Sequence, residues 1–186
     1  MTLIEKAIVF AAVAHEGQKR KSSHIPYITH PYAVGMLLLK ENCSEETVAA
    51  GILHDTLEDT DVTYEEIEKE FGEKVAKLVL AVSEPDKSLP WEKRKEHTIR
   101  KLKQAGLEEV QIIAADKLHN LRSIRYELEK NGEEVWNRFN RGKEKQRWYY
   151  TKMMEVLSEK KEQSPLIREL EEEVRKVFGD ELVQRE

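Results

Sequence analysis

Apolar residues recur at helical spacing along almost the whole chain, and this periodicity limits the fold more than any other feature of the sequence. Leu3, Ala7 and Ala11 begin the pattern, and Leu170 and Val174 continue it near the end. Spacings of three and four residues place such side chains on one face of an α-helix. No window alternates convincingly with period two, so we expect no sheet. The sequence therefore predicts an all-α protein.

Capping residues and glycines give the expected helix boundaries. Thr63 and Glu66 have the spacing of a capping box, and Pro31 suits the first turn of a helix. The predicted helices cover residues 2–15, 31–41, 44–60, 63–71, 73–82, 91–104, 108–129, 133–139, 143–161 and 165–178. Residues 83–90 are irregular and predict an exposed loop.

The length favours one domain, because 186 residues with 39% hydrophobic content suffice for one well-cored domain and not for two sizeable ones. We expect this domain to span residues 1–157. Residues 158–186 are expected to form a helical extension packed on the same domain. The alternative for the last helix is a contact in a homo-oligomer.

The charge and the chain ends exclude several classes of protein. The formal net charge of −5 provides no global attraction to nucleic acid or an anionic membrane. The amino terminus turns amphipathic at once, and no later apolar run approaches the length of a membrane span. The single cysteine, Cys43, excludes an intrachain disulfide framework. We therefore expect a cytoplasmic protein without a nucleic-acid or membrane partner.

Four ionisable residues lie close together in the second half of the predicted helix 44–60. His54 and Asp55 are followed by Glu58 and Asp59, and helical spacing would bring all four side chains to one patch. Imidazole and carboxylate groups both suit divalent transition metals. The alternative is an ordinary solvated acidic helix end.

Two other segments are suited to complete such a site. His30 stands at a helix start, and Asp116 interrupts an apolar helix face. A buried carboxylate is costly unless it is paired or coordinated, so either a metal or a basic side chain is expected beside Asp116. Asn120, one turn later, would share this face and is expected to bind a substrate group or orient a ligand.

The order His30, His54-Asp55, Asp116 resembles the H…HD…D pattern of the HD-domain metal-dependent phosphohydrolases. Longer stretches are similar to the RelA/SpoT-type hydrolase domain and to the stand-alone small alarmone hydrolases, and together they extend the resemblance to about residues 3–157. These stretches are residues 14–21, 26–31, 50–60, 71–79 and 115–122.

The resemblance implies an all-α HD fold with one divalent ion, most often manganese in the alarmone hydrolases. It implies that His30, His54, Asp55 and Asp116 hold the ion, that Glu58 and Asp59 orient and deprotonate the attacking water, and that Arg20 and Lys21 contact substrate phosphates. Arg94 and Lys95 match more loosely, and a solvated helix face is the alternative. Tyr150 occupies roughly the place of a substrate-contacting tyrosine, and an aromatic core residue is the alternative.

The expected activity is hydrolysis of ppGpp to GDP and pyrophosphate. The connector from Arg20 to Tyr27 is one residue longer than the usual pattern in alarmone hydrolases, which bears on substrate preference. One alternative is an HD phosphohydrolase that acts on another phosphorylated nucleotide or nucleotide cofactor. The other is a non-catalytic nucleotide sensor. Nothing after residue 157 is large enough for a synthetase domain, so we expect hydrolysis without synthesis.

Overall fold

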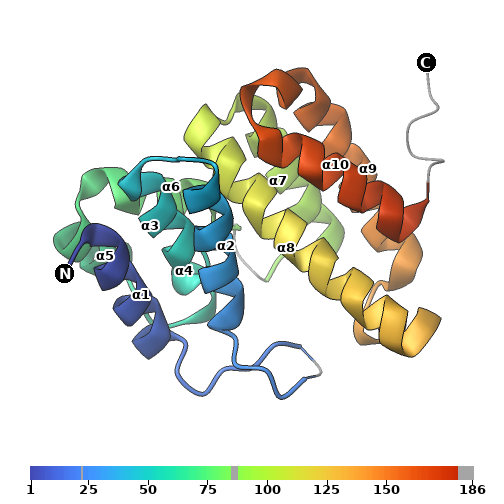
Figure 1. Cartoon of the computed structure of the whole chain (residues 1–186), viewed down its shortest axis with the longest axis horizontal. Helices are drawn as coiled ribbons and strands as arrows, with labels where there is room; N and C mark the ends of the chain where they lie inside the picture. Colours follow the sequence, from blue (N-terminus) through green and yellow to red (C-terminus); the bar gives the residue numbers. More distant parts are fainter. Residues whose placement is uncertain (22, 85–87, 180–186) are drawn as a thin grey trace. The chain divides into compact units, whose positions relative to one another are not determined.

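The structure, a computed structural model, describes residues 1–21, 23–84 and 88–179. Within these ranges the regular elements are helices, with one isolated bridge between Lys19 and Pro26. The all-α prediction is therefore confirmed (Figure 1). No helix in the described part of the chain has the length and apolar character needed to cross a membrane. The loop predicted at 83–90 includes residues 85–87, which lie outside the described residues.

The chain forms two compact units, which are described separately. Unit 1 comprises Met1–Pro85 with Gly106–Asp116, and unit 2 comprises Asp86–Ala105 with Lys117–Glu186. Unit 1 contains α1 (Leu3–Ala14), α2 (Thr29–Lys40), α3 (Glu45–Leu53), α4 (Thr56–Asp59), α5 (Tyr64–Phe71), α6 (Glu73–Val82) and the beginning of α8 (Leu107–Asn131). Unit 2 contains α7 (Trp91–Gln104), the rest of α8, the 3-10 helix η1 (Gly132–Arg138), α9 (Gly142–Leu157), the 3-10 helix η2 (Ser158–Gln163) and α10 (Pro165–Phe178).

Helix α3 is the centre of unit 1. Every residue from Thr47 to Leu53 is buried, and the helix packs against α1, α2 and α6 (Figure 1). Burial of so many apolar side chains stabilises the unit, at about 25 cal/mol per Å² of apolar surface removed from water. The residues that follow α3 are consequently fixed at one end of a well-packed helix.

Two glycines allow α2 and α3 to approach closely. A Cβ added at Gly35 would lie 2.5 Å from Cγ1 of Ile52, and one added at Gly51 would lie 2.2 Å from Cδ1 of Leu38. Both neighbours are almost fully buried, with exposures of 2% for Ile52 and 0% for Leu38. Both distances are far below van der Waals contact, so the close spacing of the two helices favours residues without a side chain at these positions.

Replacing Gly35 by alanine is therefore expected to destabilise the protein by up to about 2 kcal/mol. Overpacking a core costs about 1–3 kcal/mol, which outweighs the roughly 1 kcal/mol that alanine gains over glycine in a helix. Urea unfolding measures the difference. In the background Ile52→Ala, which removes the clashing atoms, the same substitution should become neutral or stabilising. An equal loss in both backgrounds would contradict this account.

The core of unit 2 is built around α9, which packs against α7, η1, η2 and α10. Tyr150 of α9 and Trp136 of η1 both contact the ring of Phe178, with centroids 5.7 Å and 5.5 Å away. Helix α10 buries Leu166, Ile167, Leu170, Glu173, Val174, Val177 and Phe178. Glu173 is ion-paired with Arg125 of α8. The last helix is thus a packed part of unit 2.

Most predicted boundaries agree with the structure to within two residues. Helix α5 has the predicted capping box, with Thr63 Oγ1 accepting from the Glu66 amide and the Glu66 carboxylate accepting from the Thr63 amide. The prediction of one helix over 143–161 was wrong, because α9 ends at Leu157 and the 3-10 helix η2 follows. The domain boundary near residue 157 stays a prediction.

Candidate metal centre

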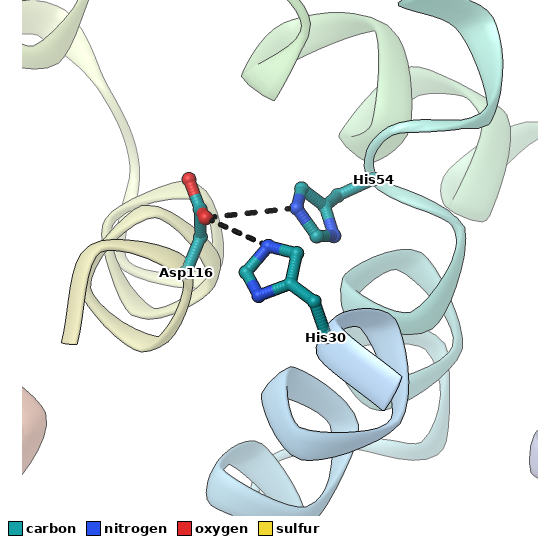
Figure 2. Close-up of side chains that lie close together, drawn as sticks. All are labelled: His30, His54 and Asp116. Atoms are coloured by element: carbon teal, nitrogen blue, oxygen red, sulfur yellow. Dashed lines mark ion pairs between the residues drawn. The ribbon is translucent and has the colours of Figure 1, made fainter. Parts of the chain in front are cut away.

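Three side chains from distant parts of the sequence converge in unit 1. His30 comes from the first turn of α2, His54 from the residues directly after α3, and Asp116 from α8. Figure 2 shows the two imidazoles and the carboxylate pointing toward one another. One ligand atom from each residue lies within 4.8 Å of the others. Oδ1 of Asp116 is 3.1 Å from Nε2 of His30 and 3.8 Å from Nε2 of His54.

Asp55 adds a second carboxylate to this group. Its Oδ2 is 2.9 Å from Nε2 of His54 and 3.7 Å from Nε2 of His30. The side chains of Asp55 and Asp116 are only 16% and 13% exposed, and both histidines are buried. The structure therefore brings together all four residues that the sequence predicts as metal ligands, and shields them from water.

The backbone at His54 and Asp55 differs from the prediction of one continuous helix over 44–60. Helix α3 ends at Leu53, and the one-turn helix α4 begins at Thr56. Side chains bond to carbonyls at the end of α3: Nδ1 of His54 lies 2.7 Å from the Gly51 oxygen, and Thr56 Oγ1 lies 2.7 Å from the Leu53 oxygen. Such bonds satisfy carbonyls that a continuing helix would otherwise use. His54 and Asp55 consequently lie in a turn between α3 and α4.

The bond to Gly51 also orients the imidazole of His54. A carbonyl oxygen can only accept, so Nδ1 of His54 is the donor and carries the proton. Nε2 then faces the carboxylates of Asp55 and Asp116. A histidine whose other ring nitrogen donates to a backbone carbonyl is the usual arrangement of a metal ligand. The orientation of His54 thus fits a cation site.

The pKa values of three of the four groups describe how protons are shared within the site. Burial alone would lower the pKa of His54, but the carboxylates of Asp55 and Asp116 raise it to about 9. Burial lowers the pKa of His30, despite its hydrogen bond with Asp116. Burial would raise the pKa of Asp55, yet the neighbouring His54 holds that pKa well below its ordinary value. At neutral pH, His54 is therefore an imidazolium paired with Asp55.

Two imidazole nitrogens and two carboxylates suit a divalent cation, because they supply both nitrogen and oxygen ligands and two negative charges. Three or four protein ligands are usual for a tight site. A cation between the four groups would replace the proton that joins His54 to the carboxylates. The donor set thus fits a divalent metal ion.

Apparent Mn²⁺ affinity is expected to rise with pH. In the metal-free protein the proton on His54 must leave before Nε2 can bind an ion. Since the pKa of His54 is about 9, the proton is held below that pH, and affinity should rise roughly tenfold per pH unit from about pH 7 to 8. Calorimetry in buffers of different protonation enthalpy measures the affinity and the released proton. A constant affinity without proton release would contradict the expectation.

The two predicted water-activating residues lie on α4. Glu58 is half-buried, and its Oε1 accepts a hydrogen bond of 2.5 Å from the Glu84 amide. The side chain of Asp59 is exposed. Its backbone oxygen accepts a bond of 2.6 Å from Nε2 of Gln18. The one-turn helix that carries both acids is therefore fixed from two sides, directly after Asp55.

The predicted phosphate contacts of unit 1 lie in the connector between α1 and α2. Lys21 is exposed, and the guanidinium carbon of Arg20 is 5.7 Å from the ring centre of Tyr27. The Arg20 amide donates to the Ile25 oxygen at 2.9 Å, which closes the connector into a loop beside the bridge of Lys19 and Pro26. The backbone thus returns to Tyr27, three residues before His30.

The remaining predicted substrate contacts belong to unit 2. Asn120 lies four residues after Asp116 on α8. Lys95 of α7 has its Nζ 4.8 Å from the ring centre of Tyr149, and its neighbour Arg94 precedes it on the same helix. Tyr150 is 4% exposed and contacts Tyr149 and Phe178. These contacts make Tyr150 part of the aromatic core, the alternative that the sequence left open. Substrate contact by these residues stays a prediction.

Sequence reasoning missed the contribution of Tyr27. Its hydroxyl donates a hydrogen bond of 2.5 Å to Oδ2 of Asp55. Burial and the charge of Asp55 raise the pKa of this phenol far above its ordinary value, so it remains a donor. In the sequence, Tyr27 belongs to a stretch, residues 26–31, that resembles known motifs, and no role was predicted for Tyr27 itself. No spacing rule connects residues 27 and 55.

Comparison with known proteins places these features in a family. The family model described as HD domain matches residues 7–144. The bifunctional (p)ppGpp synthase/hydrolase SpoT of Escherichia coli is 41% identical over 127 residues, covering 65% of this chain and 18% of SpoT. A GTP pyrophosphokinase of Streptomyces coelicolor is 41% identical over 126 residues, covering 66% of this chain and 15% of that protein. The chain thus spans less than a fifth of the length of these relatives.

A solved structure matches over nearly its full length. It is that of a metazoan ortholog of SpoT described as hydrolysing ppGpp, with a TM-score of 0.78 and 29% identity. The match covers 97% of this chain and 98% of that one. The HD domain match includes all of the four converging residues and extends through both units, which agrees with the single-domain prediction. The chain belongs to the HD domain family.

Proposed function

We propose that this chain is a metal-dependent phosphohydrolase that removes the 3′ diphosphate of guanosine tetra- or pentaphosphate. The observation that carries the proposal is the group of His30, His54, Asp55 and Asp116 in a chain of the HD domain family. Further support comes from the similarity to SpoT and to the metazoan ortholog described as hydrolysing ppGpp. The products would be GDP or GTP and pyrophosphate.

In this proposal the four converging residues hold one divalent ion, and Mn²⁺ is the leading candidate. Such an ion supplies Lewis-acid activation of water near neutral pH. Glu58 and Asp59 orient the water and accept its proton as it adds to the phosphorus on the 3′ oxygen. The bond between that phosphorus and the 3′ oxygen breaks, and the oxygen takes up the proton given by the water and remains on the nucleotide as a hydroxyl.

The substrate carries several phosphate charges, which basic residues would balance. We assign phosphate contacts to Arg20 and Lys21, because a guanidinium fork suits phosphate oxygens and an ammonium group acts as a point charge. The cation–π contact of Arg20 with Tyr27 would fix the direction of the guanidinium. Arg94, Lys95, Asn120 and Tyr150 are further candidates for nucleotide contacts. For Tyr150, its burial favours a structural role.

The experiment that tests the function is a nucleotide panel with purified protein. Pyrophosphate release from ppGpp should require Mn²⁺ and should stop with a chelator. A mixture of ATP and GTP should give no ppGpp, although one relative is named a GTP pyrophosphokinase. If ppGpp is not hydrolysed while another nucleotide is, the proposed substrate is wrong. The proposal of metal-dependent hydrolysis would still hold. Tight ppGpp binding without turnover under any metal would instead identify a sensor.

A further inference from the structure

We propose that Tyr27 is a positioning residue that holds a metal ligand with its hydroxyl and a phosphate-binding arginine with its ring. The first half of this inference concerns only the four-residue metal centre. The second half rests on the proposed function, since it assumes that Arg20 contacts the substrate.

The hydroxyl of Tyr27 meets the carboxylate oxygen that faces both histidines. Its bond of 2.5 Å ends on Oδ2 of Asp55, and the same Oδ2 lies 2.9 Å from Nε2 of His54 and 3.7 Å from Nε2 of His30. A carboxylate oxygen has more than one acceptor direction. The phenol can therefore fill one direction while the other remains aimed between the histidines. Without the hydroxyl, the carboxylate loses one of the contacts that fix its direction and keeps the ion pair with His54.

The ring of Tyr27 is itself held on two sides. The centre of the His15 ring is 5.0 Å from that of Tyr27, and the guanidinium carbon of Arg20 is 5.7 Å from it. His15 is buried, with 2% exposure, and its Nδ1 lies 2.8 Å from Oε1 of Gln18. Gln18 Oε1 must accept, since its amide nitrogen donates to the Asp59 oxygen. These contacts give the tyrosine a rigid support at the end of α1.

The position of Tyr27 links the connector with the metal centre. The tyrosine lies three residues before His30, where its amide donates to the Gln18 oxygen at 2.9 Å and its own carbonyl accepts from the His30 amide at 2.9 Å. The connector from Arg20 to Tyr27, which is one residue longer than the usual pattern, thus ends on a residue that contacts Asp55 directly. One side chain serves both the ligand and the phosphate contact.

Two substitutions separate the tasks of the hydroxyl and the ring. Tyr27→Phe keeps the ring, and should weaken Mn²⁺ binding by about 10-fold, because loss of an outer partner typically costs 10–100-fold in metal affinity. The KM for ppGpp at saturating Mn²⁺ should stay within about twofold, since the ring still contacts Arg20. Tyr27→Leu removes both contacts and should weaken Mn²⁺ binding equally while raising KM about threefold or more.

Tyr32→Phe is the matched control. Tyr32 is also half-buried, and its hydroxyl donates to the Ile8 oxygen at 3.4 Å, away from the four ligands. This variant should bind Mn²⁺ like the original protein. Calorimetry on the chelator-treated full chain measures the affinity without any turnover, and circular dichroism confirms that each variant folds. Because Tyr27→Phe deletes one oxygen atom only, its fold is expected to persist.

The outcomes separate this inference from the proposed function. Weaker Mn²⁺ binding by Tyr27→Phe and not by Tyr32→Phe supports the positioning role, even if ppGpp is not the substrate. Unchanged Mn²⁺ affinity in Tyr27→Phe overturns that role, even if the original protein hydrolyses ppGpp. If the KM of Tyr27→Leu equals that of Tyr27→Phe, the claim that the ring of Tyr27 positions Arg20 is wrong. If the original protein fails to bind Mn²⁺, the metal half of the inference is overturned as well.

Discussion

Replacing Asp116 by asparagine is expected to abolish Mn²⁺ binding at micromolar concentrations and to lower ppGpp hydrolysis about 10³-fold or more. The substitution keeps the shape of the side chain and removes its negative charge. Oδ1 of Asp116 lies 3.1 Å from His30 Nε2 and 3.8 Å from His54 Nε2, so it is placed to share a cation with both histidines. Loss of a direct ligand should exceed the 10–100-fold loss of affinity that removal of an outer partner causes.

The loss of activity follows from the loss of the ion. Water without a metal has a pKa near 15.7, whereas a bound divalent ion can bring that pKa close to 7. The nucleophile would therefore be scarce at neutral pH in the variant. Elemental analysis of the purified protein and pyrophosphate release measure the two effects independently.

Asp61→Asn is the matched control for charge. Asp61 lies in the same unit and is exposed, so this change removes one negative charge without touching the converging group. It should keep both metal content and activity. An Asp116→Asn protein that retains one tightly bound ion and full turnover would show that Asp116 is not a ligand, and the assignment of the metal centre would fail with it.

The helices were predictable because local features determine their ends. Thr63 and Glu66 satisfy each other's amide groups within four residues, and Gly72 follows α5 with φ of 85°, a conformation that favours glycine. Such features require no knowledge of the rest of the chain. The four converging residues were predictable for a different reason, since their types and order resemble a family pattern.

The break at His54 and Asp55 was not predictable from periodicity. Val48, Ile52 and Leu53 fit the apolar face of a longer helix equally well. At the break, Nδ1 of His54 bonds to the Gly51 oxygen and the Thr56 hydroxyl bonds to the Leu53 oxygen. Histidine and threonine are common inside helices, so their presence gives no reliable warning of these bonds.

Contacts between residues far apart in the sequence could not be predicted either. The hydroxyl of Tyr27 and the carboxylate of Asp55 meet across 28 residues because α2 and α3 pack closely. Similarly, the sequence around an aromatic residue such as Tyr150 does not distinguish a core position from a position in a substrate pocket. Its contact with Phe178 is determined by the packing of α9 and α10.

Replacing Glu58 by glutamine, or Asp59 by asparagine, is expected to lower kcat about 10²–10⁴-fold while Mn²⁺ affinity changes by less than threefold. A positioned general base typically contributes a rate factor of this size. Glutamine keeps the oxygen that accepts from the Glu84 amide, so Glu58→Gln should preserve α4 and remove only the basic group. The separation of kcat from metal affinity distinguishes these acids from the four converging residues.

The double variant tests whether the two acids act together. If both serve the same water, Glu58→Gln with Asp59→Asn should lose about as much kcat as the more severe single variant, because residues that act as a unit are not additive. Glu70→Gln, an exposed change on α5, should keep the original kcat. Full activity in Glu58→Gln together with a large loss in Asp59→Asn would reduce Glu58 to a structural contact with Glu84. Full activity in both single variants would show that another group is the general base.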